Sequence, residues 1–248
     1  RTPLTLIISP AEQLLKSEPL SEEGEEFVRL INKNARRMQR FVDQLLELRQ
    51  IQENRYTLNR SRVDLTELIR QVLEGFQAMA RHAGITLLDN LPEKPLYLNI
   101  DRENIEIVLY NLLSNAFKYS PPDSEVRLKL TVNQAGEVRV AVLDEGPGVK
   151  EESLSEIFEL FHVDAISSSK VEKSSGIGLS LAKELVQLHG GHIEARNRET
   201  GGLEVAFTLM PGNETIPPED LSPARKSING SLRPFFKDEP GAELTKSK

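Results

Sequence analysis

The sequence has no cysteine, few aromatic residues and no long apolar run. Without cysteine, disulfides and thiolate metal sites are excluded. No stretch approaches the roughly 20 apolar residues that span a bilayer, and no signal peptide is visible, so we expect no membrane contact by this chain. Basic residues are also in deficit, at 31 against 38 acidic ones. The net charge of −7 argues against nucleic-acid binding through a basic surface.

Length and composition set the scale of the fold. With 248 residues, 38% of them hydrophobic, the chain can bury the core of one large domain or two modest ones. It begins at Arg1 rather than methionine, which indicates further residues upstream, where a membrane anchor could lie.

Two amphipathic helices are predicted at the N-terminus. The first covers residues 3–16, and residues 17–21 connect it to a second helix that reaches about Glu53. Ser21 followed by two glutamates is a typical helix start, because a hydroxyl caps the first N–H groups and acids suit the positive end. Seven residues of the second helix alternate steps of four and three: Phe27, Ile31, Asn34, Met38, Phe41, Leu45 and Leu48.

This 3.5-residue period is typical of coiled-coil packing, with Asn34 as a polar group that fixes register or oligomeric state. Two helices cannot bury such stripes alone. A homodimer that forms a four-helix bundle is therefore favoured over a single-chain hairpin packed on the rest of the chain.

Helices and strands interleave after residue 56. Residues 57–63 have some strand character and are expected to form a hinge between domains. Predicted helices cover residues 64–82, capped by Asp64 and stopped by Gly84, a stretch that opens at Asp101, and residues 176–189. Predicted strands cover residues 85–88, 96–100, 126–132, 138–143, 193–196 and 203–209. Tight turns such as residues 133–137 imply antiparallel pairs, which indicates a two-layer α+β sandwich with a mixed sheet. The proline-punctuated residues 212–248 are expected to be a linker or tail.

The helix that opens at Asp101 carries unusual polar residues. Asn111, Asn115 and Tyr119 are four apart and project from adjacent turns of one face, with Lys118 nearby. An amide oxygen is a suitable Mg²⁺ ligand, and a lysine neutralises phosphate charge. The alternative is a surface helix with solvated side chains.

Two glycine motifs favour the nucleotide interpretation. Asp144-Glu-Gly-Pro-Gly148 follows a strand, where the carboxylate can accept a hydrogen bond from an exocyclic amine and the glycines let backbone approach a flat ring. Gly176-Ile-Gly-Leu179 opens a helix, whose N–H groups suit phosphate. Residues 162–175, with five serines and two lysines, are typical of a mobile lid.

Taken in order, the amide-bearing helix, Asp-x-Gly-x-Gly, Ile157-Phe-Glu-Leu-Phe161, the polar lid and Gly-x-Gly-Leu resemble the ATP-binding domain of sensor histidine kinases. Its superfamily also includes gyrase, heat-shock 90 and mismatch-repair ATPases. Arg1-Thr-Pro-Leu-Thr5 resembles the end of the family's phosphoacceptor box, in which His-Glu-x precedes Arg-Thr-Pro. The resemblance implies a dimerisation and phosphotransfer hairpin over residues 1–56 and an ATP-binding domain over residues 64–211. It also implies an acceptor histidine three residues upstream of Arg1.

The resemblance also implies roles for individual residues. Asn115 would ligate Mg²⁺, and Asp144 would hold the adenine amine. Three residues are expected to serve catalysis: Asn111 near the phosphates, Lys118 on a phosphate, and Thr2, at the family's phosphatase position or simply at a helix N-cap. The remaining expected nucleotide contacts are Tyr119, Gly146, Gly148, Phe158, Phe161, Lys173, Gly176, Ile177, Gly178 and Leu179.

The implied reaction is transfer of the γ-phosphoryl group of Mg-ATP to a histidine and then to a response-regulator aspartate. The receiver domain would act in trans or be fused C-terminally, and the chain would be the cytoplasmic part of an inner-membrane sensor. Related ATPases place a water-activating glutamate where this chain has Asn111, a poor base, so a kinase is favoured over a hydrolase. A dimeric scaffold that binds nucleotide without transfer is the other alternative. Two details complete the comparison: His189 is expected to cap a helix end rather than accept phosphate, and the run at residues 161–164 is one residue shorter than the family's.

Overall fold

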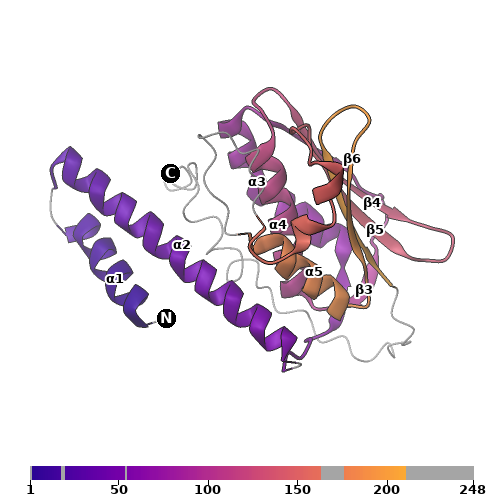
Figure 1. The fold of residues 1–248 in the computed structure, drawn as a ribbon, viewed down its shortest axis with the longest axis horizontal. Coiled ribbons are helices and arrows are strands. Elements are labelled where there is room, and N and C mark those ends of the chain that lie inside the picture. Colours follow the sequence, from indigo (N-terminus) through magenta and orange to yellow (C-terminus); the bar gives the residue numbers. More distant parts are fainter. Residues whose placement is uncertain (1, 18–19, 54, 163–175, 211–248) are drawn as a thin grey trace. The chain divides into compact units, whose positions relative to one another are not determined.

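The computed structural model describes residues 2–17, 20–53, 55–162 and 176–210, which divide into two compact units between Tyr56 and Thr57 (Figure 1). The first unit is a helical hairpin and the second an α+β domain. Among the described residues, no helix is long and apolar enough to cross a membrane.

The hairpin consists of α1 (Thr2–Ser17) and α2 (Glu22–Gln52). Ser21 caps α2 as predicted, because its hydroxyl accepts the Gly24 N–H at 3.2 Å. An ion pair between Arg36 and Glu12 joins the helices. Among the hairpin residues whose side chains are described, four are buried: Ala11, Ala35, Leu48 and Ile51.

Most of the predicted stripe on α2 is not covered within the hairpin. Only Leu48 is buried, Phe41 and Leu45 are half-buried, and the N-terminal part is exposed. Four apolar residues of α2 are at least half exposed: Phe27, Leu30, Ile31 and Met38. The amide of Asn34 donates to the Leu30 carbonyl of its own helix at 2.9 Å.

The second unit is built on a five-stranded sheet in the order β2-β4-β5-β7-β6. Its strands are β2 (Thr86–Asn90), β4 (Glu125–Val132), β5 (Val138–Leu143), β6 (Ile193–Asn197) and β7 (Leu203–Leu209). The β2–β4 pair is parallel and the other pairs are antiparallel, which confirms the predicted mixed sheet. The helices α3 (Leu65–Ala83), α4 (Arg102–Tyr119) and α5 (Gly178–Leu188) lie on one side of it (Figure 1).

Local sequence signals account for most element ends. The Asp64 carboxylate caps α3 and Gly84, at φ 66°, ends it, while Asp101 caps α4 by accepting the Asn104 N–H at 3.2 Å. The β4–β5 hairpin turns through residues 133–137, with Gly136 at φ 81°. All these features confirm the predictions.

Two differences concern strand pairing and a helix start. The successive predicted strands at residues 85–88 and 96–100 are not partners, since β2 joins the large sheet while β3 (Tyr97–Ile100) pairs with β1 (Ser61–Asp64). The strand character predicted for residues 57–63 is confirmed at residues 61–63, which belong to β1. Helix α5 begins at Gly178 rather than at residue 176, because Gly176 has a positive φ of 68° that a right-handed helix cannot contain.

The core that fixes α4 lies between α4, α3 and the sheet. Phe76 of α3 is fully buried, and its ring centroid lies 5.4 Å from that of Tyr110 and 5.5 Å from that of Phe117. Because both of these rings belong to α4, one side chain packs on the helix at two points about two turns apart. Burial of a Phe side chain contributes about 1.5–3 kcal/mol.

Candidate functional site

The amides of α4 lie where the helix meets the start of α5. Asn111 is only 7% exposed, whereas Asn115, Lys118 and Tyr119 are half-buried. The buried Nδ2 of Asn111 has no hydrogen-bond partner among the described residues. Leaving a buried donor unsatisfied costs about 1–3 kcal/mol. This donor is therefore available to a ligand that binds beside it.

Gly178 brings the start of α5 against the same amide. A Cβ at Gly178 would lie 2.7 Å from Asn111 Oδ1, so only glycine lets the two segments come this close. In the described part of the chain, no side chain caps the first turn of α5, and that turn carries no acidic residue. Free N–H groups at a helix N-terminus, without a competing carboxylate, suit a phosphate.

The residues on either side of Gly178 differ in exposure. Ile177 is fully buried, so its side chain belongs to the core and only its backbone borders the site. Leu179 is half-buried on the first turn of α5.

Asp144 directly follows β5, and one of its two carboxylate oxygens accepts hydrogen bonds from the protein. Its Oδ1 accepts the N–H groups of Gly146 at 2.8 Å and Leu203 at 3.1 Å. Among the described residues, no hydrogen bond uses Oδ2. Burial raises the pKa of the Asp144 carboxyl above its ordinary value, and the two backbone donors oppose that rise. An oriented acceptor of this kind suits an exocyclic amine.

The last turn of α4 and the Asp-x-Gly-x-Gly turn lie against each other. A Cβ at Gly146 would lie 2.9 Å from the Tyr119 carbonyl and 3.0 Å from Asp144 Oδ1. The predicted residues Tyr119, Asp144 and Gly146 are thus brought together. The Lys118 ammonium lies 5.1 Å from the Tyr119 ring centroid, near the same helix end.

Asn197, which lies against Gly148, was not predicted from the sequence as part of the site. It has a φ of 71°, and a Cβ there would lie 2.7 Å from Oδ1 of Asn197, at the end of β6. No short motif contains Asn197, which is 49 residues away from Gly148 in the sequence. Only the pairing of β6 with β7 brings it to this turn.

The ends of the predicted lid meet. Phe158, in the short 3₁₀ helix η2 (Glu156–Phe158), is buried, whereas Phe161 is 56% exposed with a strained φ of 65°. The Phe161 N–H donates to the Gly176 carbonyl at 2.9 Å, and a Cβ at Gly176 would lie 2.8 Å from the Phe161 backbone.

Several predictions fall outside the described part of the chain. These are Lys173, Lys170, the lid itself and the tail over residues 212–248. Thr2 lies in α1, but its side chain is also outside the described part.

No group of three His, Asp or Glu side chains that could hold a metal occurs in the described ranges. A divalent ion at Asn115 would therefore take its other ligands from phosphate oxygens and water, as Mg²⁺ commonly does. The partly exposed amide, the phosphate-compatible start of α5 and the half-engaged carboxylate fit a nucleotide with such an ion.

His189 confirms the capping role expected from the sequence. It is the C-cap residue of α5, and its ring joins two helices. Its Nδ1 lies 2.7 Å from the Leu185 carbonyl, and its Nε2 accepts the Asp101 N–H at 3.1 Å. Only the neutral ring with its proton on Nδ1 satisfies both, and burial lowers the pKa of His189 accordingly.

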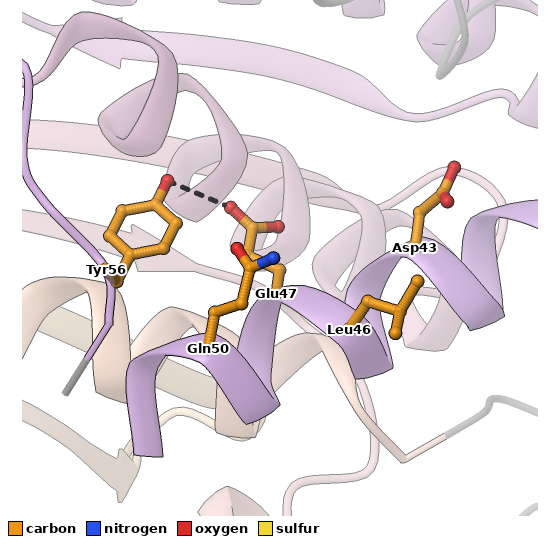
Figure 2. Close-up of a pocket in the computed structure, with 5 residues that line it drawn as sticks. All are labelled: Asp43, Leu46, Glu47, Gln50 and Tyr56. Carbon is orange, nitrogen blue, oxygen red and sulfur yellow. Dashed lines mark hydrogen bonds between the residues drawn. The ribbon is translucent and has the colours of Figure 1, made fainter. Parts of the chain in front are cut away.

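A separate hollow of about 550 Å³ lies on the hairpin unit (Figure 2). It is lined by Asp43, Leu46, Glu47, Gln50 and Tyr56. The Tyr56 hydroxyl donates to Glu47 at 3.2 Å. None of the predicted nucleotide contacts lines this hollow, and we assign it no part in the site.

Two family models match the chain. Residues 1–54 match the His Kinase A (phospho-acceptor) domain, and residues 100–213 match the histidine kinase-, DNA gyrase B- and HSP90-like ATPase.

Curated relatives extend the likeness over most of the chain. Hybrid signal transduction histidine kinase D of Dictyostelium discoideum is 33% identical over 84% of the chain and 14% of its own length. Sensor histidine kinase WalK of Bacillus subtilis (strain 168) is 34% identical over 84% of the chain and 34% of its own length. The chain thus spans about a third or less of these relatives.

Solved structures share the fold. Full-length ShkA in complex with AMPPNP is 26% identical with a TM-score of 0.70, over 84% of the chain and 43% of ShkA. Histidine kinase ThkA in complex with the response regulator protein TrrA is 25% identical with a TM-score of 0.61, over 85% of the chain and 58% of the matched chain.

Proposed function

The chain belongs to the sensor histidine kinases of two-component systems, and we propose that its α+β unit binds Mg-ATP between α4, the turn after β5 and the start of α5. The kinase would transfer the γ-phosphoryl group to a histidine upstream of Arg1 and from there to a response-regulator aspartate. One observation carries the proposal: at the start of α5, Asn111 lies against Gly178 through its Oδ1, while its buried Nδ2 has no hydrogen-bond partner among the described residues.

Each predicted residue then has a task. Oδ2 of Asp144 accepts a hydrogen bond from the adenine amine. Gly146 and Gly148, which have no side chains, let the backbone of the turn lie close to the adenine ring. Asn111 and Lys118 contact phosphate oxygens, and Tyr119 flanks the nucleotide. Asn115 would be the protein ligand of a Mg²⁺ ion, whose charge would offset that of the phosphates. The N–H groups at Gly178 and Leu179 orient the terminal phosphates at the helix N-terminus.

The choice of a kinase over a hydrolase rests on Asn111. An amide has no basic lone pair that could take a proton from water, so the site lacks a general base at this place. The relatives named as histidine kinases support the same choice over a nucleotide-binding scaffold.

We further propose that residues 1–56 form the dimerisation and phosphotransfer hairpin, residues 57–63 the connection, residues 64–211 the ATP-binding domain, and residues 212–248 a linker or tail. The exposed apolar side chains of α2 support a homodimer, since a second copy would cover them. The first turns of the hairpin would receive the response regulator, in trans or fused C-terminally, and Thr2 would serve its dephosphorylation. The ThkA–TrrA complex supports such a partner. The chain would act on the cytoplasmic side of an inner-membrane sensor.

Two experiments test the proposal. Calorimetric titration of the chain with a Mg-ATP analogue should show saturable binding, and absence of saturation with folded protein would refute the site. With the upstream residues restored, radiolabelled ATP should leave an acid-labile, base-stable label on the protein. Binding without such a label would instead support the scaffold.

A further inference from the structure

The turn that follows β5, residues 144–149, is held at its first end by the β6–β7 hairpin. We call these residues the nucleotide turn. The Asp144 N–H donates to the Leu203 carbonyl at 2.9 Å, and the Leu203 N–H returns a bond to Asp144 Oδ1 at 3.1 Å. The Arg198 guanidinium donates to the Asp144 carbonyl. Gly202 packs so closely on that carbonyl that a Cβ would lie 2.0 Å from it.

The second end of the nucleotide turn is held by one side chain. The Asn197 Oδ1 accepts the Val149 N–H at 2.9 Å, and its Nδ2 donates to the Val149 carbonyl at 2.6 Å. The same Nδ2 donates to Glu151 Oε1 at 3.1 Å. The amide thus bonds both backbone groups of Val149, as a neighbouring strand would.

The contact with Asn197 explains why residue 148 is a glycine. Its missing Cβ leaves the space in which Asn197 Oδ1 lies, only 2.7 Å from the position that a Cβ would take. The last glycine of Asp-x-Gly-x-Gly therefore makes room for an amide of the protein itself.

Asn197 can affect the position of the Asp144 carboxylate through the residues that lie between the two anchored ends of the turn. Gly146 supplies one of the two N–H groups that fix the rotamer of Asp144, and Gly146 and Gly148 lie between the two anchored ends. Glycine restricts the backbone least of all residues. Release of Val149 would leave the backbone at Gly148 and Gly146 free to move, and Asp144 Oδ1 would then keep only the Leu203 N–H as a fixed donor.

We propose that Asn197 is a positioning residue that fixes the nucleotide turn and thereby sets the preference for adenine over guanine nucleotides. The inference rests on the proposed function, in which Asp144 accepts the adenine amine. Guanine carries a carbonyl oxygen at that ring position, which the Asp144 carboxylate repels. Rejection requires that the carboxylate cannot turn away, because discrimination depends on polar groups held in place.

The test compares Asn197→Ala with Thr200→Ala in the full chain. Thr200 is exposed in the same hairpin and, among the described residues, forms no hydrogen bond with the nucleotide turn. Titration with Mg-ADP should show about tenfold weaker binding for Asn197→Ala, because nucleotide binding would then have to order a turn that two backbone hydrogen bonds already order in the wild type. Mg-GDP binding should change less, so the ratio of the two dissociation constants narrows. Thr200→Ala should match the wild type.

A double-mutant cycle guards against simple loss of folding. Gly148→Ala should weaken Mg-ADP binding less in the Asn197→Ala background than in the wild type, because the clash with Oδ1 is gone and only the cost of the positive φ remains. Asn197→Ser, which keeps one bonding group, should lie between wild type and Asn197→Ala.

The outcomes separate two failures. Unchanged affinity and selectivity in Asn197→Ala, or additive effects of the two substitutions, would overturn the inference while the proposed function stands. A wild-type chain that binds no adenine nucleotide would instead overturn the proposed function.

Discussion

The two units of the chain treat their large apolar side chains in opposite ways. In the hairpin, Phe27 is 56% exposed and Met38 is 58% exposed, although both lie on the regular stripe of α2. In the α+β unit, Phe76 and Phe207 are completely buried. Burial of such a side chain contributes about 1.5–3 kcal/mol, so the first unit leaves unused a stabilisation that the second obtains from its own sequence.

The difference shows that similar apolar patterns serve different purposes. The α+β unit has a sheet on which its helices pack, and it completes its core alone. The described part of the hairpin consists of two helices only, so the apolar side chains of its stripe need another surface if they are to be buried from water. Four predictions test this contrast between a self-sufficient and an incomplete unit.

The largest effect is expected from Phe76→Ala. The ring packs on Tyr110 and Phe117, and removing it leaves a cavity in the core, so the α+β unit should lose about 3–5 kcal/mol of unfolding free energy. This loss is measured by denaturant unfolding, with nucleotide binding as the signal that reports the folded α+β unit. Phe27→Ala, the matched change on the exposed stripe, should leave that transition unchanged, and a comparable loss from it would contradict the contrast.

Asp144→Asn should weaken Mg-ATP binding by about a hundredfold, since a hydrogen bond to a charged group is worth about 1.5–3 kcal/mol. Two backbone N–H groups face Oδ1, so the amide oxygen would take that place and Nδ2 would oppose the adenine amine as a second donor. Calorimetry measures the affinity, and sedimentation should show an unchanged oligomeric state. Normal ATP binding by this variant would disprove the role of Asp144.

Ile31→Glu should raise the dissociation constant of the proposed dimer by about thirtyfold, because a charge buried in an apolar interface costs roughly 2 kcal/mol or more. Ile31 is 50% exposed in the single hairpin. Sedimentation equilibrium measures the dimer, and ATP binding by the α+β unit should persist. Glu26→Gln, at an exposed position outside the stripe, is the control. Equal dimer stability in both variants would argue against the bundle.

The smallest effect concerns pH and His189. Burial lowers its pKa below the ordinary value of 6.5, so the unfolded chain takes up a proton at a higher pH than the folded one. The contribution of the neutral His189 ring to the unfolding free energy is therefore complete above pH 6.5. It is lost as the pH falls toward the lowered pKa. Thermal unfolding between pH 7.5 and about 5 should show a decline in Tm that His189→Gln reduces. The same substitution at the exposed His82 should leave the decline unchanged.

Local chemistry made much of the fold predictable. Ser21, Asp64, Asp101 and Gly84 mark helix ends through bonds to residues within four positions, and the β4–β5 turn lies between adjacent strands. Each of these signals lies within a few residues of its effect, so the sequence alone reveals it.

Contacts between distant segments were not predictable in the same way. The pairing of β1 with β3 joins residues across a whole helix, and Asn197 reaches Val149 from 48 positions away. The start of α5 was placed two residues early, because the positive φ of Gly176 results from its contact with Phe161. In the candidate site the motif residues were found, whereas the residue that holds their turn was not.

The segment just before β1 has a consequence for chimeric kinases. The Asn59 N–H donates to Asp101 Oδ2 at 2.8 Å, and the Arg60 guanidinium donates to the Leu188 carbonyl at 3.2 Å. These residues therefore fasten the entering chain to the N-cap residue of α4 and to the last residue of α5. A foreign dimeriser should be joined ahead of Thr57, since a splice after Arg60 would remove the Arg60 guanidinium and change the backbone path that brings the N–H of residue 59 to Asp101.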